Sequence, residues 1–81
     1  MNYNDIEIDV HGYFVDVALK KIIKIAIELS EKKISSFVVI HGYSHGCSIL
    51  NAVRSLDKKC RRIRCVYPEP FNEGRSIVCL K

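Results

Sequence analysis

The stretch that decides the fold is Phe37-Val38-Val39-Ile40-His41-Gly42. Four consecutive apolar residues, with no polar residue in alternation, are typical of a strand that is buried on both faces, as central parallel strands are. The polar, glycine-rich segment 41–46 then ends the strand. Helical and strand patterns alternate around it, which predicts an α/β fold with right-handed crossovers.

The segment before this strand predicts one further strand and a long helix. Apolar residues alternate with acidic ones over 6–10, which is the pattern of a strand with one buried face. From Val15 to about Lys33, apolar residues recur at steps of three and four, so an amphipathic helix of about 18 residues is expected there. Ile27 falls away from the centre of the apolar stripe and is expected to be partly exposed.

The segment after the strand completes the predicted fold. We expect a second helix over 48–58, a strand over 62–66, a loop over 67–74 that holds both prolines, and a last strand over 76–80. The element order is then β-α-β-α-β-β. This order predicts a two-layer sandwich, in which two helices cover one face of a four-stranded, mostly parallel mixed sheet. The terminal strand pair is expected to form an antiparallel edge.

Length and composition favour one small folded domain. The chain has 81 residues, of which 48% are hydrophobic and 27% are charged. These values fit a single domain over 1–81, with its core from about 6 to 80. No apolar run approaches the roughly 20 residues that a membrane span needs, and the acidic N-terminal segment differs from a signal peptide. We therefore expect a cytoplasmic monomer without membrane association, and reduced thiols at Cys47, Cys60, Cys65 and Cys79.

The formal charge of +4 is distributed unevenly along the chain. Residues 1–16 carry four acids and neither Lys nor Arg. Six basic residues lie within eleven positions, namely Arg54, Lys58, Lys59, Arg61, Arg62 and Arg64. A cluster of this density suits a polyanion, so we expect these residues, together with Arg75, to bind DNA or RNA. Solvation of a helix end and an exposed strand is the alternative explanation.

The candidate functional residues lie at the carboxyl edge of the predicted sheet. Asp9 and His11 share a face because strand residues alternate, and His41 ends the next strand. Open α/β sheets bind their ligands at this edge. Each residue alone also fits an ordinary turn or a solvated strand end. The glycine-rich turn before the second helix allows close backbone approach and attracts anions, so it is a candidate phosphate-binding turn. Its residues are Gly42, Ser44 and Gly46.

These segments resemble the motifs of the small MutS-related (Smr) domain. Residues 8–12, Ile-Asp-Val-His-Gly, match the L-D-x-H-G motif of that family, and 41–46 correspond to its H-G-x-G turn. Residues 72–74, Asn-Glu-Gly, correspond to its late N-E-G-G stretch. Two positions depart from the pattern, since Ser44 and Arg75 each stand where the family has glycine.

The resemblance implies a fold like the C-terminal domain of bacterial translation initiation factor three, and endonuclease or nicking activity on DNA or RNA. It implies that Asp9, His11, His41, Gly42 and Gly46 take part in cleavage. His11 and His41 would then serve as general base and general acid, because imidazole titrates near neutral pH. Asp9 would orient a histidine or hold a divalent cation, Mg²⁺ or Mn²⁺. RNA cleavage through the 2′-hydroxyl would need no metal, whereas DNA hydrolysis favours one.

Two other classes of function remain open. The same fold could bind DNA or RNA without turnover, which the serine at position 44 favours. A metal-dependent enzyme that acts on a small substrate through His41, His45 and Cys47 is the less favoured class.

Overall fold

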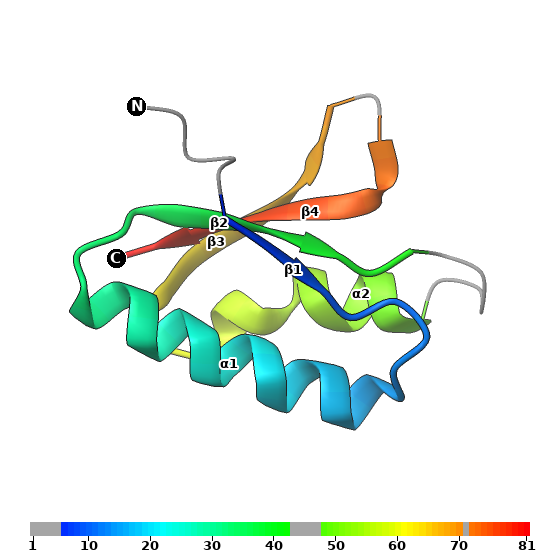
Figure 1. Cartoon of the computed structure of the whole chain (residues 1–81), viewed down its shortest axis with the longest axis horizontal. Coiled ribbons are helices and arrows are strands. Elements are labelled where there is room, and N and C mark those ends of the chain that lie inside the picture. The colour runs from blue at the N-terminus through cyan, green and yellow to red at the C-terminus, as the bar shows by residue number, and fades with distance from the viewer. Residues whose placement is uncertain (1–5, 43–47, 71) are drawn as a thin grey trace.

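Two helices cover one face of a four-stranded sheet in the computed structural model, which describes residues 6–42, 48–70 and 72–81 (Figure 1). In chain order the elements are β1 (Glu7–Asp9), α1 (Val15–Glu31), β2 (Ser36–Ile40), α2 (Ser48–Arg54), the 3₁₀ helix η2 (Leu56–Lys58), β3 (Ile63–Glu69) and β4 (Asn72–Leu80). The predicted two-layer α/β sandwich is confirmed. Among the described residues, no helix has the length and apolar character needed to cross a membrane.

The sheet is mixed, with the strand order β1-β2-β4-β3. β1 and β2 pair in parallel, with Asp9 opposite Ile40, whereas β4 pairs antiparallel with both β2 and β3. The prediction of mostly parallel pairing was therefore wrong, whereas the terminal strand pair β3–β4 forms an antiparallel edge, as predicted. Within the described sheet only the β1–β2 pairing is parallel, and the last strand lies in the interior.

The composition of the last two strands explains this order. β4 is buried on both faces from Ser76 to Leu80, as a central strand should be. β3 exposes Arg64 and contains Pro68, and proline is tolerated mainly at sheet edges because it cannot donate a ladder hydrogen bond. The predicted loop 67–74 is also shorter than expected, since pairing continues to Glu69 in β3 and begins again at residue 72.

The main core lies between the helices and the sheet. Its fully buried members include Val10, Ala18, Ile22, Ala26, Phe37, Val39, Val53, Leu56 and Val78. Ile27 is 38% exposed, as predicted. The second helix is shorter than predicted, because the Ser55 hydroxyl donates to the carbonyl of Asn51 at 3.0 Å and the chain tightens into η2.

A smaller apolar cluster lies on the opposite face of the sheet, where Val38, Ile77 and Cys79 pack with Cys65. β2 is thus buried on both faces, as its four apolar residues predicted. Cys60, Cys65 and Cys79 are free thiols, in line with the expectation of reduced cysteines, and Cys47 lies outside the described residues. Burial raises the pKa of the Cys79 thiol, and the neighbouring Cys65 adds to the effect.

Lys33 closes α1 in a left-handed backbone conformation, with φ of 63°. Its N–H donates to the carbonyl of Ser30 at 3.0 Å, and the N–H of Ile34 donates to the carbonyl of Leu29 at 3.0 Å. This bond pair is the Schellman motif, in which glycine usually holds the left-handed position. The helix therefore ends in a common cap geometry, but Lys33 holds the left-handed position in which a residue other than glycine is strained.

We expect Lys33→Gly to raise the free energy of unfolding by about 0.5 kcal/mol, because relief of the left-handed strain exceeds the added entropy of the unfolded chain. Lys32→Gly is the matched control. Its φ is −87°, so the same change there relieves no strain and should lower stability. Urea denaturation measures both, and equal destabilisation by the two variants would contradict the strain at Lys33.

Candidate functional site

Asp9 and His11 form a hydrogen-bonded pair where β1 ends. Asp9 Oδ1 accepts from the ring Nδ1 of His11 at 2.5 Å and from the His11 backbone N–H at 3.1 Å. The two side chains are 52% and 69% exposed. The ring hydrogen bond, followed by the backbone one, lowers the pKa of Asp9 below its ordinary value of 3.8. Asp9 is therefore ionised at neutral pH.

The hydrogen bond to Asp9 shows which ring nitrogen of a neutral His11 carries the hydrogen. A carboxylate can only accept, so Nδ1 carries the hydrogen. Nε2, for which no partner is found among the described residues, is left as the proton acceptor. The ring thus presents its basic nitrogen on an exposed edge of the sheet.

Strand alternation and a tight turn fix the position of the pair. Val10 points into the core and is fully buried, so Asp9 and His11 point to the other side. The N–H of Val10 donates to the carbonyl of Ile40 at 2.8 Å, which anchors this position to β2. Gly12 then adopts φ of +78°, and the N–H of Tyr13 donates back to the Val10 carbonyl at 3.1 Å. The predicted sharing of one face is confirmed.

His41 lies at the same sheet edge but belongs to the interior, where it is 2% exposed. Its Nδ1 donates to the carbonyl of Gly42 at 2.7 Å, and its Nε2 accepts from the hydroxyl of Ser76 at 2.8 Å. Burial, with a contribution from the positive charge of Arg54, lowers the pKa of His41 below its ordinary 6.5, although the Gly42 contact opposes this shift. The ring is therefore neutral at pH 7.

This environment does not favour the predicted acid or base role for His41. Both ring nitrogens are engaged by protein groups, and burial separates the ring from a substrate in solvent. Ser76 shares the helix-facing side of β4 with Val78, which is in the main core. His41 and His11 thus lie at one edge and on opposite faces. The geometry gives His41 a positioning role in the turn that follows β2.

Gly74 holds that turn in place. The backbone N–H groups of His41 and Gly42 both donate to its carbonyl, at 3.0 and 2.9 Å. Its own N–H donates to the side-chain oxygen of Asn72 at 3.2 Å. The Gly42 N–H is thus already used, so this part of the predicted phosphate-binding turn is corrected. Ser44 and Gly46, the other predicted members, lie outside the described residues.

Gly42 lets the backbone of the second motif, which begins at His41, lie close to His11 of the first motif. It adopts φ of +67°, which favours glycine, and a Cβ placed on it would lie 3.6 Å from the Cβ of His11. The segments that begin at Asp9 and at His41 therefore meet at the backbone of Gly42. Through Gly74, β4 joins them.

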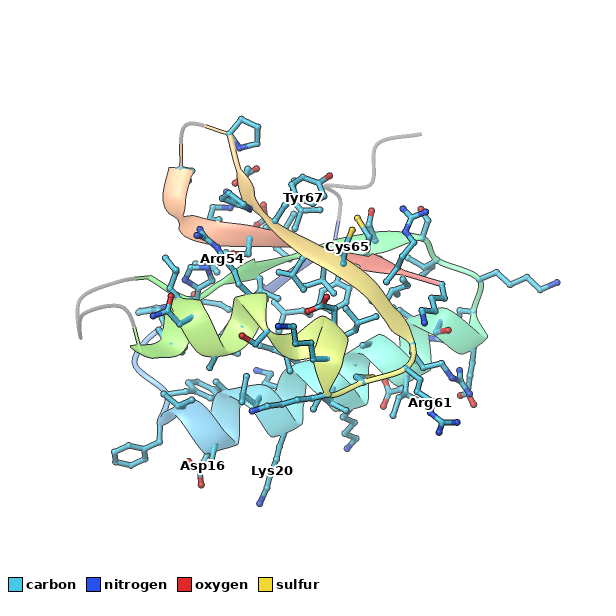
Figure 2. All side chains as sticks on the ribbon, turned by 180° about the vertical axis from the view of Figure 1, so that it is seen from behind. Asp16, Lys20, Arg54, Arg61, Cys65 and Tyr67 are labelled. Carbon is cyan, nitrogen blue, oxygen red and sulfur yellow. The ribbon has the colours of Figure 1, made fainter. Side chains whose placement is uncertain are left out.

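The basic residues around position 62 lie at the far end of the sheet. Arg62 donates to Ser30 Oγ, near the end of α1, at 3.4 Å, and its carbonyl accepts from the N–H of Lys81 at 2.9 Å. It therefore lies near the start of β2 and β3, whereas Asp9 lies beside the end of β2. Figure 2 shows Arg61 and Arg54 toward opposite ends of the molecule.

The resulting separation is large for a domain of this size. β2, with five residues, spans about 13 Å between its end residues, and three strand spacings add about 14 Å across the sheet. Together they place the 61–64 segment about 20 Å from the Asp9–His11 pair. These arginines do not border the pair.

Arg75 is engaged by two carboxylates on the sheet face opposite the helices. Its guanidinium donates to Glu7 of β1, and its Nε lies 2.8 Å from Oε2 of Glu69 of β3. The Nε contact is an ion pair without hydrogen-bond geometry. Because two carboxylates surround one guanidinium, Arg75 offers no net positive charge, which does not favour the predicted contact with nucleic acid.

The described residues do not form a metal centre. No group of three or more His, Cys, Asp and Glu side chains in 6–42, 48–70 and 72–81 is placed to hold a metal ion. Asp9, the expected ligand for a divalent cation, has Oδ1 engaged twice by His11. His45 and Cys47, expected with His41 in the small-substrate alternative, lie outside the described residues. This donor set does not fit a site that holds Mg²⁺ or Mn²⁺ by itself.

Comparison with known proteins identifies the fold. No family model and no curated protein sequence matches the chain. Among solved structures, the crystal structure of the Smr domain of Thermus thermophilus MutS2 matches with a TM-score of 0.85 and 22% sequence identity. The match covers 94% of this chain and 98% of that one. The chain has the fold of an Smr domain. The resemblance seen in the motifs is confirmed at the level of the fold.

Ser76 is a member of the candidate site that the sequence analysis missed. It is fully buried and donates to Nε2 of His41. A signal for it was present, since Ser76, Val78 and Leu80 share the core-facing side of β4. A polar residue on an otherwise apolar face requires a buried partner, and the histidine after the neighbouring strand is one.

We expect the free energy of unfolding to fall as the pH drops below about 6.5, the ordinary pKa of histidine. Because folding lowers the pKa of His41, the unfolded chain binds this proton first. The stabilisation is therefore complete above the unfolded value and is lost as the pH falls toward the lowered pKa. Urea denaturation between about pH 7.5 and about pH 5.5 measures the effect.

Two variants separate burial from hydrogen bonding. His41→Gln should flatten this pH dependence. Ser76→Ala should keep it, because the ring stays buried, while it lowers the free energy of unfolding by about 1–3 kcal/mol at every pH. An equally steep pH dependence in His41→Gln would contradict the assignment to His41.

Proposed function

We propose that this Smr-like domain cleaves phosphodiester bonds within DNA or RNA, with His11 as the general base and Asp9 as its partner. The observation that carries the proposal is the 2.5 Å hydrogen bond from the His11 ring to an ionised Asp9, on an exposed sheet edge. The motif resemblance supports it, because it implies endonuclease activity at these two residues.

The pair has the chemistry that this role needs. Nε2 of His11 takes a proton from the attacking oxygen, which is the 2′-hydroxyl in RNA and a water molecule in DNA. That oxygen bonds to phosphorus, the bond from phosphorus to the leaving sugar oxygen breaks, and the leaving oxygen takes a proton from solvent. Asp9 holds the ring through Nδ1, so that the correct tautomer faces the substrate, and it stabilises the positive charge that forms. Gly42 lets the second turn approach His11 closely, because no side chain intervenes.

The distant basic cluster is placed to bind nucleic acid on one side of the cleavage point rather than the phosphate that reacts. A separation of about 20 Å corresponds to about six base pairs at 3.4 Å each. We infer that phosphates at that distance contact the basic residues of the 58–64 segment, which are Lys58, Lys59, Arg61, Arg62 and Arg64. The substrate is then a polymer at least this long.

Asp9→Asn and His11→Ala should each lower the cleavage rate by about 10²- to 10⁴-fold, the range typical of a general base and of the residue that sets its tautomer. Purified protein is assayed on supercoiled plasmid and on structured RNA, with and without EDTA. Glu28→Gln removes a negative charge from the exposed side of α1 and serves as the matched control for Asp9→Asn.

The outcomes separate the proposal from its rival. Undiminished cleavage in both site variants would rule out the Asp9–His11 assignment. Binding without cleavage by the unaltered protein, at every metal condition, would instead support the binding module with the same fold.

The combined variant Arg61→Ala, Arg62→Ala and Arg64→Ala should weaken binding of long substrates and lower the slope of log affinity against log salt by about two to three. The turnover number at saturating substrate should stay unchanged, because these residues lie far from His11. Oligonucleotides shorter than about six nucleotides should show no effect. A fall in turnover number with unchanged affinity would show that the arginines reach the reacting phosphate.

A further inference from the structure

Two aromatic side chains are exposed directly after the His11-Gly12 turn. Phe14 is 82% exposed and Tyr13 is 40% exposed, and Val17 on the first turn of α1 is 47% exposed. A phenylalanine at this exposure gains little from folding, and neighbouring exposed apolar residues mark an interaction surface. This surface begins two residues from the proposed general base.

The backbone fixes these aromatic side chains relative to His11. The N–H of Tyr13 donates to the carbonyl of Val10 at 3.1 Å, and the carbonyl of Phe14 accepts from the N–H of Ala18 at 2.9 Å. Phe14 is the residue that caps α1, in an extended conformation with φ of −63° and ψ of 149°. Three residues of chain place its Cα within about 11 Å of that of His11. The backbone of the aromatic pair is therefore held within about 11 Å of His11.

The surroundings of the aromatic pair are basic. Lys21 Nζ lies 5.1 Å from the centre of the Tyr13 ring and donates to its hydroxyl at 3.2 Å. Lys20 and Lys24 follow on α1, with Asp16 as the acid among them, so the first half of the helix carries a net positive charge. Figure 2 shows Asp16 and Lys20 on the outer side of α1.

The combination of exposed rings with lysines favours nucleic acid over a protein partner. Lysine is depleted in protein–protein interfaces. Proteins that bind single strands combine aromatic side chains, on which bases stack, with positive charge that follows the phosphates. A base inside a duplex cannot reach such a ring unless it is unpaired, at a cost of a few kcal/mol. The surface therefore fits a strand whose bases are free.

We propose that Tyr13 and Phe14 form a stacking subsite for an unpaired nucleobase of the strand whose phosphate lies at His11. The subsite rests on the proposed function and adds a substrate class to it, namely single-stranded or locally unpaired DNA or RNA. The rings orient the strand, so they are specificity residues rather than catalytic ones.

A fluorescent variant tests the stacking directly. The chain has no tryptophan, so Phe14→Trp introduces a single indole at the subsite. A single-stranded oligonucleotide should quench its fluorescence, whereas an abasic strand of the same length and charge should bind without quenching. Phe14→Ala should weaken binding of the single strand by about 10- to 100-fold and leave binding of a duplex unchanged, and Phe14→Trp should restore it.

The control variant is Ile27→Ala, which truncates a side chain of α1 that is 38% exposed and lies away from the site. It should leave binding of both substrates unchanged. Circular dichroism verifies that each variant is folded, and sedimentation measures its oligomeric state.

Four results would overturn the inference. If Phe14→Ala binds the single strand as tightly as the unaltered protein, or if the abasic strand quenches as strongly, no base stacks there, while the proposed function stands. If Phe14→Ala dissociates a dimer and leaves oligonucleotide binding intact, a second copy covers this surface. If no form of the protein binds any oligonucleotide at low salt, the proposed function fails first.

Discussion

The carbonyl of Gly74 is the interaction on which the candidate site depends. It accepts from the N–H groups of both His41 and Gly42, and so ties the start of β4 to the turn that leaves β2. That turn places Gly42 against His11, and the buried bond from Ser76 to His41 fixes it from the core side. Three segments far apart in the chain are thereby joined, which explains why their motifs belong together.

The two His-Gly pairs within the described residues, at 11–12 and 41–42, illustrate how environment decides the role of a histidine. Each histidine follows the end of a strand and precedes a glycine with positive φ. His11 is exposed and is paired with a carboxylate, which suits proton transfer, whereas His41 is buried and is paired with a hydroxyl and a carbonyl. Because neighbouring strand residues point to opposite faces, an exposed ring and a buried ring lie at one sheet edge.

Local patterns predicted what depends on local residues. The period of the apolar residues placed α1 and the buried β2, and the spacing of Asp9 and His11 predicted a shared face. The position of β4 between β2 and β3 depends on which strand can be buried on both faces, a competition that strand patterns alone do not decide. The same holds for Arg75, whose two carboxylate partners come from strands that are distant in the sequence.

The charges around the Asp9–His11 pair bear on which phosphates the proposed function could use. On the sheet face opposite the helices, Glu7, Asp9 and Glu69 carry three negative charges against the one of Arg75, so a phosphate that reaches His11 meets net repulsion. Attraction has to come from α1 and from the distant basic cluster of 58–64. A small phosphodiester that lies at His11 does not reach the 61–64 segment, which is about 20 Å away. Under the proposed function, a polymer would reach α1 and the basic cluster at once, so this separation would favour long substrates over short ones.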